Sequence, residues 1–218
     1  MCFSATASFV TAALTGAAGV AALRRAGWSA DVPLAAIPLV FSVQQAAEGA
    51  LWLALDQSDA GQWPWFLTQV FLVFALVVWP VYAPATALAL EPPGWRRHVM
   101  RVCGLFGVAI AAFFAVQLAT VHHEGYISGH HILYRTEVEE PLVAGGIYIA
   151  ATGLSLLVSS ARAVSLLGLV VFAGSLIAWA FYAEVFVSVW CFFAAASSFV
   201  ILTHFEVRAR QERRAVAG

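Results

Sequence analysis

The sequence contains no lysine, and charged residues make up only 11% of its 218 positions, against about 25% in an ordinary soluble domain. All 11 basic residues are arginines, and the formal net charge is −1. Without lysine, a retinal Schiff base and any covalent mechanism that starts from a lysine amine are excluded. The near-neutral charge gives no support for nucleic-acid binding, so nucleic acid is not an expected partner.

Hydrophobic residues make up 62% of the chain, which leaves too little polar surface to cover a water-soluble globule. The lipid bilayer is therefore the expected partner. Each of seven apolar runs is close to the roughly 20 residues that a spanning helix needs. We predict an all-α polytopic membrane protein, a single domain over residues 1–218, with a seven-transmembrane-helix bundle at about 3–23, 33–55, 65–90, 99–121, 141–160, 163–182 and 185–205.

The arginines predict the orientation, since basic residues in short loops favour the cytoplasmic side. Seven crossings leave Arg135 alone on one side and put the other ten arginines on the opposite side: Arg24, Arg25, Arg96, Arg97, Arg101, Arg162, Arg208, Arg210, Arg213 and Arg214. We therefore expect a multi-pass protein of the bacterial cytoplasmic membrane, with its N-terminus outside and its C-terminus in the cytoplasm. The first run lacks a preceding basic region, so it is interpreted as a retained helix rather than a signal peptide.

Three local patterns predict details of the bundle. Small hydroxylated residues from Ser4 to Thr15 form one stripe of the first helix, which favours a central position for it. Trp79 and Pro80 predict a kink, followed by a second break at Pro84. The outer loop, 122–140, contains the alternating stretch YISGHHILY, which is typical of a short hairpin.

The run 33–55 carries two glutamines and a carboxylate where a membrane helix is normally apolar. Gln44, Glu48 and Trp52 are spaced by four residues and share one helix face, with Gln45 beside them. Glu48 lies about seven residues, or roughly 10 Å, below the expected outer end of the helix. A carboxylate at that depth must face protein or a cavity, so Glu48 marks the predicted functional site.

Other polar residues are predicted to share that outer layer. In the run 185–205, Glu184, Ser188 and Cys191 fall at i, i+4 and i+7, which puts Cys191 at a depth similar to that of Glu48. Gln117 lies at the outer end of its own run. Glu48 and Cys191 are the candidate catalytic residues. The candidate ligand-binding residues are Gln44, Gln45, Trp52, Gln117, Glu184 and Ser188.

Several of these residues suit a metal ion. Cys2 precedes the first helix on the outer side, and removal of Met1 would leave a free amine beside its thiol. His122 and His123 give the outer loop a metal-binding composition, although no zinc-motif spacing is present. The candidate metal ligands are Cys2, Glu48, Cys191, His122 and His123, and the metals that this donor set suits are zinc and copper. A disulfide between Cys2 and Cys191 is the alternative.

The stretches MCFSATASF, PLVFSVQQAAEGALW and SVWCFFAAASS together resemble an uncharacterised family of small bacterial multi-helix membrane proteins. The resemblance spans most of the chain and implies the membrane class. It draws attention to Cys2, Glu48 and Cys191 without implying an activity.

Three functions are compatible with this sequence. The first is an outward-facing buried polar site that binds a metal, a small molecule or a lipid, in a membrane-embedded enzyme or a binding protein. The second is a carrier or sensor for a small solute or proton that uses Glu48. The third is a structural membrane protein whose polar network only sets the helix packing. Enzymatic activity, the reaction and the oligomeric state stay open.

Overall fold

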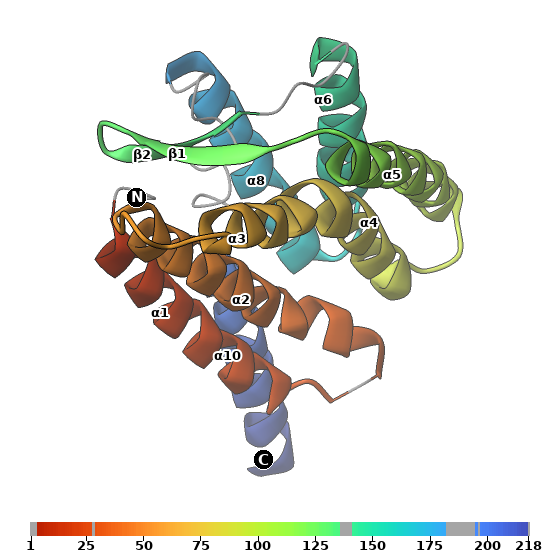
Figure 1. Cartoon of the computed structure of the whole chain (residues 1–218). Helices are drawn as coiled ribbons and strands as arrows, with labels where there is room; N and C mark the ends of the chain where they lie inside the picture. The colour runs from red at the N-terminus through yellow and green to blue at the C-terminus, as the bar shows by residue number, and fades with distance from the viewer. Residues whose placement is uncertain (1–3, 28, 136–140, 182–194, 196, 218) are drawn as a thin grey trace.

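The computed structural model describes residues 4–27, 29–135, 141–181, 195 and 197–217. These residues are mostly helical, and one short hairpin crosses one end of the helix bundle (Figure 1). The elements are α1 Ala5–Leu23, η1 Ser29–Asp31, α2 Val32–Leu55, α3 Trp63–Leu72, η2 Val73–Val78, α4 Trp79–Leu90, α5 Trp95–Thr120, β1 Glu124–Ser128, β2 His131–Arg135, α6 Pro141–Ile149, η3 Ala150–Leu154, α7 Ser155–Leu157, α8 Arg162–Phe181 and α10 Ser198–Ala217.

Four stretches are long and apolar enough to cross a bilayer, namely Ala5–Leu23, Val32–Leu55, Trp63–Leu90 and Trp95–Thr120. They match the first four predicted spans closely. Two shorter apolar helices, Val143–Leu157 and Arg162–Ile177, occupy the fifth and sixth predicted spans. About half of the seventh predicted span, 185–205, lies outside the described residues, and its described end belongs to α10, which continues to Ala217 instead of ending at 205. The structure thus bears out a mostly helical chain with four candidate membrane-spanning helices.

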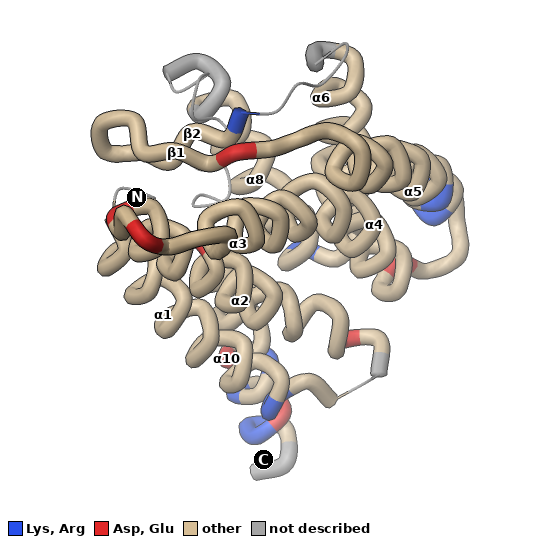
Figure 2. The backbone as a smooth tube through the Cα atoms, viewed as in Figure 1, with Lys and Arg blue, Asp and Glu red and all other residues tan. Residues whose placement is uncertain are grey.

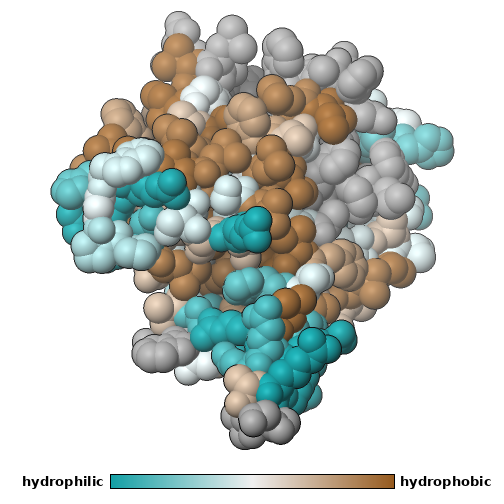
Figure 3. All heavy atoms as spheres, turned by 180° about the vertical axis from the view of Figure 1, so that it is seen from behind, coloured by the Kyte–Doolittle hydropathy of each residue, from teal (hydrophilic) through white to brown (hydrophobic). Residues whose placement is uncertain are grey.

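Large apolar side chains on the outer surface fit a lipid environment. Leu14 on α1, Leu105 on α5 and Leu169 on α8 are each more than half exposed. The rear of the molecule is mainly hydrophobic, and hydrophilic residues gather where the C-terminal helix emerges (Figure 3). An exposed apolar surface of this kind is unusual for a protein in water.

Helix α1 is not central, which corrects the expectation drawn from its hydroxylated stripe. Ser8 and Thr15 are buried against the bundle, but Val10 and Leu14 on the other faces are more than half exposed. The stripe packs on α2, where the Ser42 hydroxyl donates to the Ala12 carbonyl at 2.7 Å. Small residues allow that close approach. Helix α1 also contacts α10, and its remaining faces are left outside the bundle.

The interruption predicted at Trp79 and Pro80 is present one turn earlier than expected. A π-helical segment, η2, precedes Trp79 directly. Pro80 has no N–H to donate to Leu76, and its ring crowds that carbonyl, so the wider π turn accommodates it. The second break is not observed, because α4 continues through Pro84 to Leu90.

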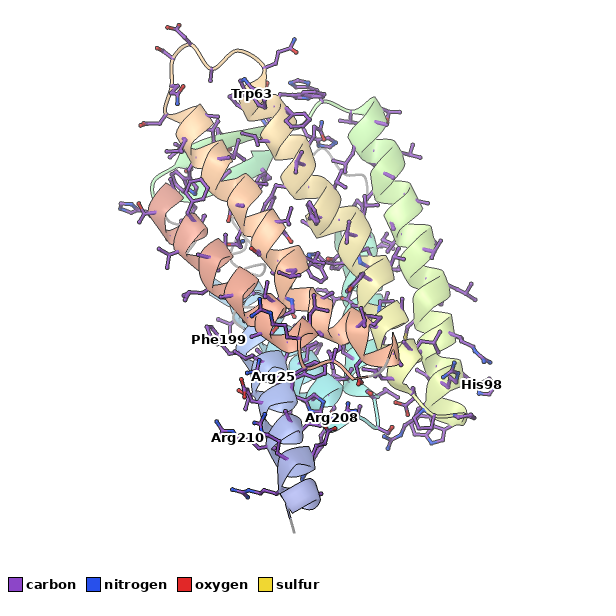
Figure 4. All side chains as sticks on the ribbon, turned by 90° about the horizontal axis from the view of Figure 1, so that it is seen from below. Arg25, Trp63, His98, Phe199, Arg208 and Arg210 are labelled. Atoms are coloured by element: carbon purple, nitrogen blue, oxygen red, sulfur yellow. The ribbon has the colours of Figure 1, made fainter. Side chains whose placement is uncertain are left out.

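Ionic contacts hold the C-terminal helix at the end of the bundle opposite Trp63 (Figure 4). Arg208 on α10 bonds Asp31 at 2.8 Å, and Arg25 bonds Glu206 at 2.7 Å. Burial lowers the pKa of the Arg208 guanidinium, but its hydrogen bonds to Asp31 and Glu212 and the charges of these two carboxylates together outweigh that effect, so the net shift is upward. The charged residues lie mainly toward the ends of the helices (Figure 2), which is typical of a membrane bundle.

Candidate functional site

The polar stripe of α2 faces the bundle interior. Gln44, Gln45 and Glu48 have no exposed surface, and Trp52 is only 9% exposed. The opposite side of the helix carries Val43 and Leu53, both about half exposed. Because residues spaced by three or four share one helix face, the α-helical conformation of this run is enough to bring the polar groups to the inside.

Glu48 accepts contacts from three segments of the chain. The Tyr134 hydroxyl of β2 donates to its Oε1 at 3.3 Å, and the Gln45 amide nitrogen donates to its Oε2 at 3.3 Å. The Ser8 hydroxyl of α1 reaches the same Oε2 at 3.5 Å. A buried carboxylate needs such donors, since leaving it without them would be expensive.

The hairpin covers this group and closes the end of the bundle. Its antiparallel register pairs Ser128 with His131, and Gly129 in the turn has a φ of 60°, a conformation that favours glycine. Ile132 is fully buried beside Leu51 and Trp52. The hairpin predicted from the alternating stretch is therefore confirmed, and it packs on α2 and α3.

Tyr134 is held in place by its ring as well as by its hydroxyl. The ring stacks on Phe71 of α3 with 4.6 Å between centroids and an interplanar angle of 3°. Sequence reasoning did not include Tyr134 or Ser8 in the site. A signal for Tyr134 existed, since strand alternation places Ile132 and Tyr134 on one face of β2.

Three buried polar atoms, two on the Glu48 face of α2 and one beneath the hairpin, have no hydrogen-bond partner among the described residues. They are the Gln45 amide oxygen, the Trp52 indole nitrogen and the Thr68 hydroxyl. Gln45 and Trp52 lie on the same helix face as Glu48, and Thr68 of α3 is next to Gly125 of the hairpin. Buried groups without partners are rare in folded proteins and often indicate a bound water, ion or ligand.

Gln44 belongs to a neighbouring structural pair. Its amide oxygen accepts a 2.7 Å hydrogen bond from the Trp79 indole, and that indole stacks on Phe41 with 4.0 Å between centroids. This pair links α2 to α4 one turn below Glu48. It lies directly after η2, where a π-helical segment often marks a functional region of a helix.

His122, His123 and Gln117 have contacts within their own segment, which joins α5 to the hairpin. His123 is 1% exposed, and its Nε2 lies 3.1 Å from the Gln117 main-chain carbonyl. His122 is exposed and lies 3.1 Å from the Glu124 carboxylate. Within the described ranges, no three His, Cys, Asp or Glu side chains come together as a metal site.

The remaining predicted site residues are Cys2, Glu184, Ser188 and Cys191, and all four lie outside the described residues. The structure therefore tests neither the two candidate thiol ligands nor the candidate catalytic role of Cys191. What it places together is an oxygen-rich group made by α1, α2 and the hairpin.

These features define a class: a mostly helical protein with four candidate membrane-spanning helices and a polar cluster buried at one end. The family is shown by a family model described as a family of unknown function (DUF6629), which matches residues 1–217. The chain belongs to this family. The chain matches no curated protein and no solved structure.

Proposed function

We propose that this chain is a multi-pass protein of the bacterial cytoplasmic membrane that binds a small cation at a site centred on Glu48, near the outer surface. The observation that carries the proposal is the convergence on one fully buried carboxylate of groups from α1, α2 and the hairpin. A cation would neutralise the carboxylate and give the Gln45 amide oxygen a partner. Carboxylate, amide and hydroxyl oxygens suit an alkali metal ion or an ammonium group.

The hairpin gives this site its selectivity in our proposal. Tyr134 closes the carboxylate from one side, and Ile132 packs on Leu51 and Trp52 beside it. Little room is left for a bulky ligand around groups that are fully buried. A small ion or a compact ammonium therefore fits better than a lipid substrate.

The cation site is tested by thermal unfolding of the purified protein in neutral detergent. Sodium, potassium and methylammonium chlorides are the probes, and a bulky quaternary ammonium chloride at the same ionic strength is the control for screening of surface ion pairs. A ligand that binds only the folded state at 100 times its Kd adds about 2.7 kcal/mol, so we expect one probe to raise Tm by several degrees.

Two variants make that measurement specific. Glu48→Gln keeps the size of the side chain but loses the charge, so the probe should no longer raise Tm. Tyr134→Phe keeps the stacked ring and loses only the hydroxyl, so binding should weaken by roughly ten-fold. Equal responses of the wild type and Glu48→Gln to every probe would remove the cation site from consideration. The three salts distinguish an alkali metal ion from an ammonium group.

The proposed topology has seven crossings, with the hairpin outside and α10 in the cytoplasm. Its support is the arginine partition, together with the position of Arg25 and Arg208 at the end of the bundle opposite Trp63 (Figure 4). We expect Ser128→Cys, in a chain whose three native cysteines are replaced by serine, to react with a membrane-impermeant maleimide in intact cells. Arg210→Cys in the same background should react only after permeabilisation. The reverse pattern would invert the orientation.

A further inference from the structure

A groove on the lateral surface of the helix bundle runs between α5 and the α6–η3 segment. It consists of two hollows of about 490 and 460 Å³, and both are lined by Phe106 and Ile147. The lining is almost wholly apolar, with Val102, Phe106 and Phe113 on one wall and Val143, Ile147 and Leu154 on the other. Because the two hollows share lining residues, they form one continuous apolar groove along the side of the bundle.

The groove is long enough to hold an acyl chain of one leaflet. It extends along α5 from His98 to Phe113, which is about 22 Å at 1.5 Å per residue. One leaflet of the hydrocarbon core is roughly 15 Å deep. Helix α5 also packs on α4 beside the groove, where an added Cβ at Gly107 would meet the Pro80 carbonyl.

Among the described residues, basic groups stand near the His98 end of the groove. His98 lines one of the two hollows, and Arg101 is an exposed residue about one turn further along α5, beside the lining of that hollow. The Arg96 guanidinium lies over the Trp95 ring at 5.4 Å, and Trp95 is 66% exposed. An exposed tryptophan beside arginines is typical of the membrane–water interface, where a phosphate headgroup would lie.

We infer that this groove holds one anionic phospholipid, with its phosphate at His98 and Arg101 and an acyl chain between α5 and α6. The charge at one end and the apolar walls beyond it match the two halves of such a molecule. Arginine binds phosphate through paired hydrogen bonds. In a zwitterionic lipid the cation of the headgroup competes with arginine for the same phosphate, so binding is weaker. The inference rests on the proposed bilayer insertion but not on the Glu48 site.

The test is a lipid titration of delipidated full-length protein in neutral detergent, followed by native mass spectrometry. The probes are phosphatidylglycerol and phosphatidylcholine with the same acyl chains. We expect one phosphatidylglycerol per chain to bind more tightly than phosphatidylcholine. The double variant His98→Ala/Arg101→Ala should lose the preference, with an affinity for phosphatidylglycerol at least about five-fold lower. Arg210→Ala, on the exposed tail, is the charge control and should have no effect.

A second pair of variants tests the apolar walls. Ala109 and Ala150 line the groove and are exposed, so Ala109→Phe/Ala150→Phe fills the groove without disturbing the core. Binding of both lipids should fall, whereas Val108→Phe on the same helix outside the groove should not change it. Glu48→Gln should also bind lipid normally, which separates this inference from the cation site.

Three results would overturn the lipid assignment: equal affinity of the wild type for both lipids, lipid binding unchanged in the filled groove, or a dimer that the filled variant abolishes. The last result would make a second copy of the chain the occupant. Circular dichroism confirms that each variant is folded before the titration.

Discussion

Gly107→Ala is expected to cause a large loss of stability, although it adds only one methyl group. A Cβ at this position would overlap the main-chain oxygen of Pro80, and backbone cannot move aside as a flexible side chain can. Helices α4 and α5 would have to separate or shift along each other. Overpacking normally lowers the free energy of unfolding by roughly 1–3 kcal/mol, and we expect about 3 kcal/mol or more because the obstacle is a carbonyl group.

The matched control for this substitution is on the same helix. An added Cβ at Gly104 meets nothing within 4 Å, so Gly104→Ala should be neutral or raise stability by roughly 0.5–1 kcal/mol through helix propensity. Unfolding by dodecyl sulfate, followed by circular dichroism in mixed micelles, measures both variants. Similar stabilities for Gly107→Ala and Gly104→Ala would show that α4 and α5 do not approach as closely as the structure has them.

Glu48→Leu is expected to produce the second large loss of stability. It removes the acceptor that the Tyr134 hydroxyl, the Gln45 amide and the Ser8 hydroxyl share. Each buried donor left without a partner lowers stability by about 1–3 kcal/mol, so the loss for the three donors should be at least about 3 kcal/mol. The same mixed-micelle unfolding experiment measures it.

Glu48→Gln separates the structural role of this residue from its proposed role in binding. The amide keeps one acceptor oxygen and nearly the same volume, so we expect a much smaller loss of stability than for Glu48→Leu. Leu53→Ala, at a half-exposed position of the same helix, should change stability by no more than about 0.5 kcal/mol. If Glu48→Leu and Glu48→Gln gave equal stabilities, the hydrogen bonds to Glu48 would not contribute to the free energy of unfolding.

The polar cluster could be predicted only in part from the sequence. The burial of Gln44, Gln45 and Glu48 follows from helical spacing inside an apolar run, because an unshielded polar group in lipid is unfavourable. The two residues that come to Glu48 from other segments were not predicted. Ser8 is 40 positions from Glu48, and Tyr134 is 86 positions away, and no local pattern encodes such a meeting.

The position of α1 shows the same limit. Its small hydroxylated stripe predicts one close helix contact, and α2 makes that contact. Whether further helices cover the remaining faces depends on the packing of the other elements. The structure leaves Val10 and Leu14 outside, so a stripe of small residues indicates one close neighbour and does not indicate a central place in the bundle.

By itself the sequence determined the apolar character of the chain, the limits of the four long apolar helices, the short hairpin and the inward side of α2. These properties depend on the apolar length and on the periodicity of neighbouring residues, which local chain geometry turns into structure. Tertiary structure alone decided that Tyr134 closes over Glu48, that Pro80 rests on Gly107 and that a groove opens between α5 and α6. Such features arise from contacts between segments that are distant in the sequence. These contacts depend on how whole helices pack against one another.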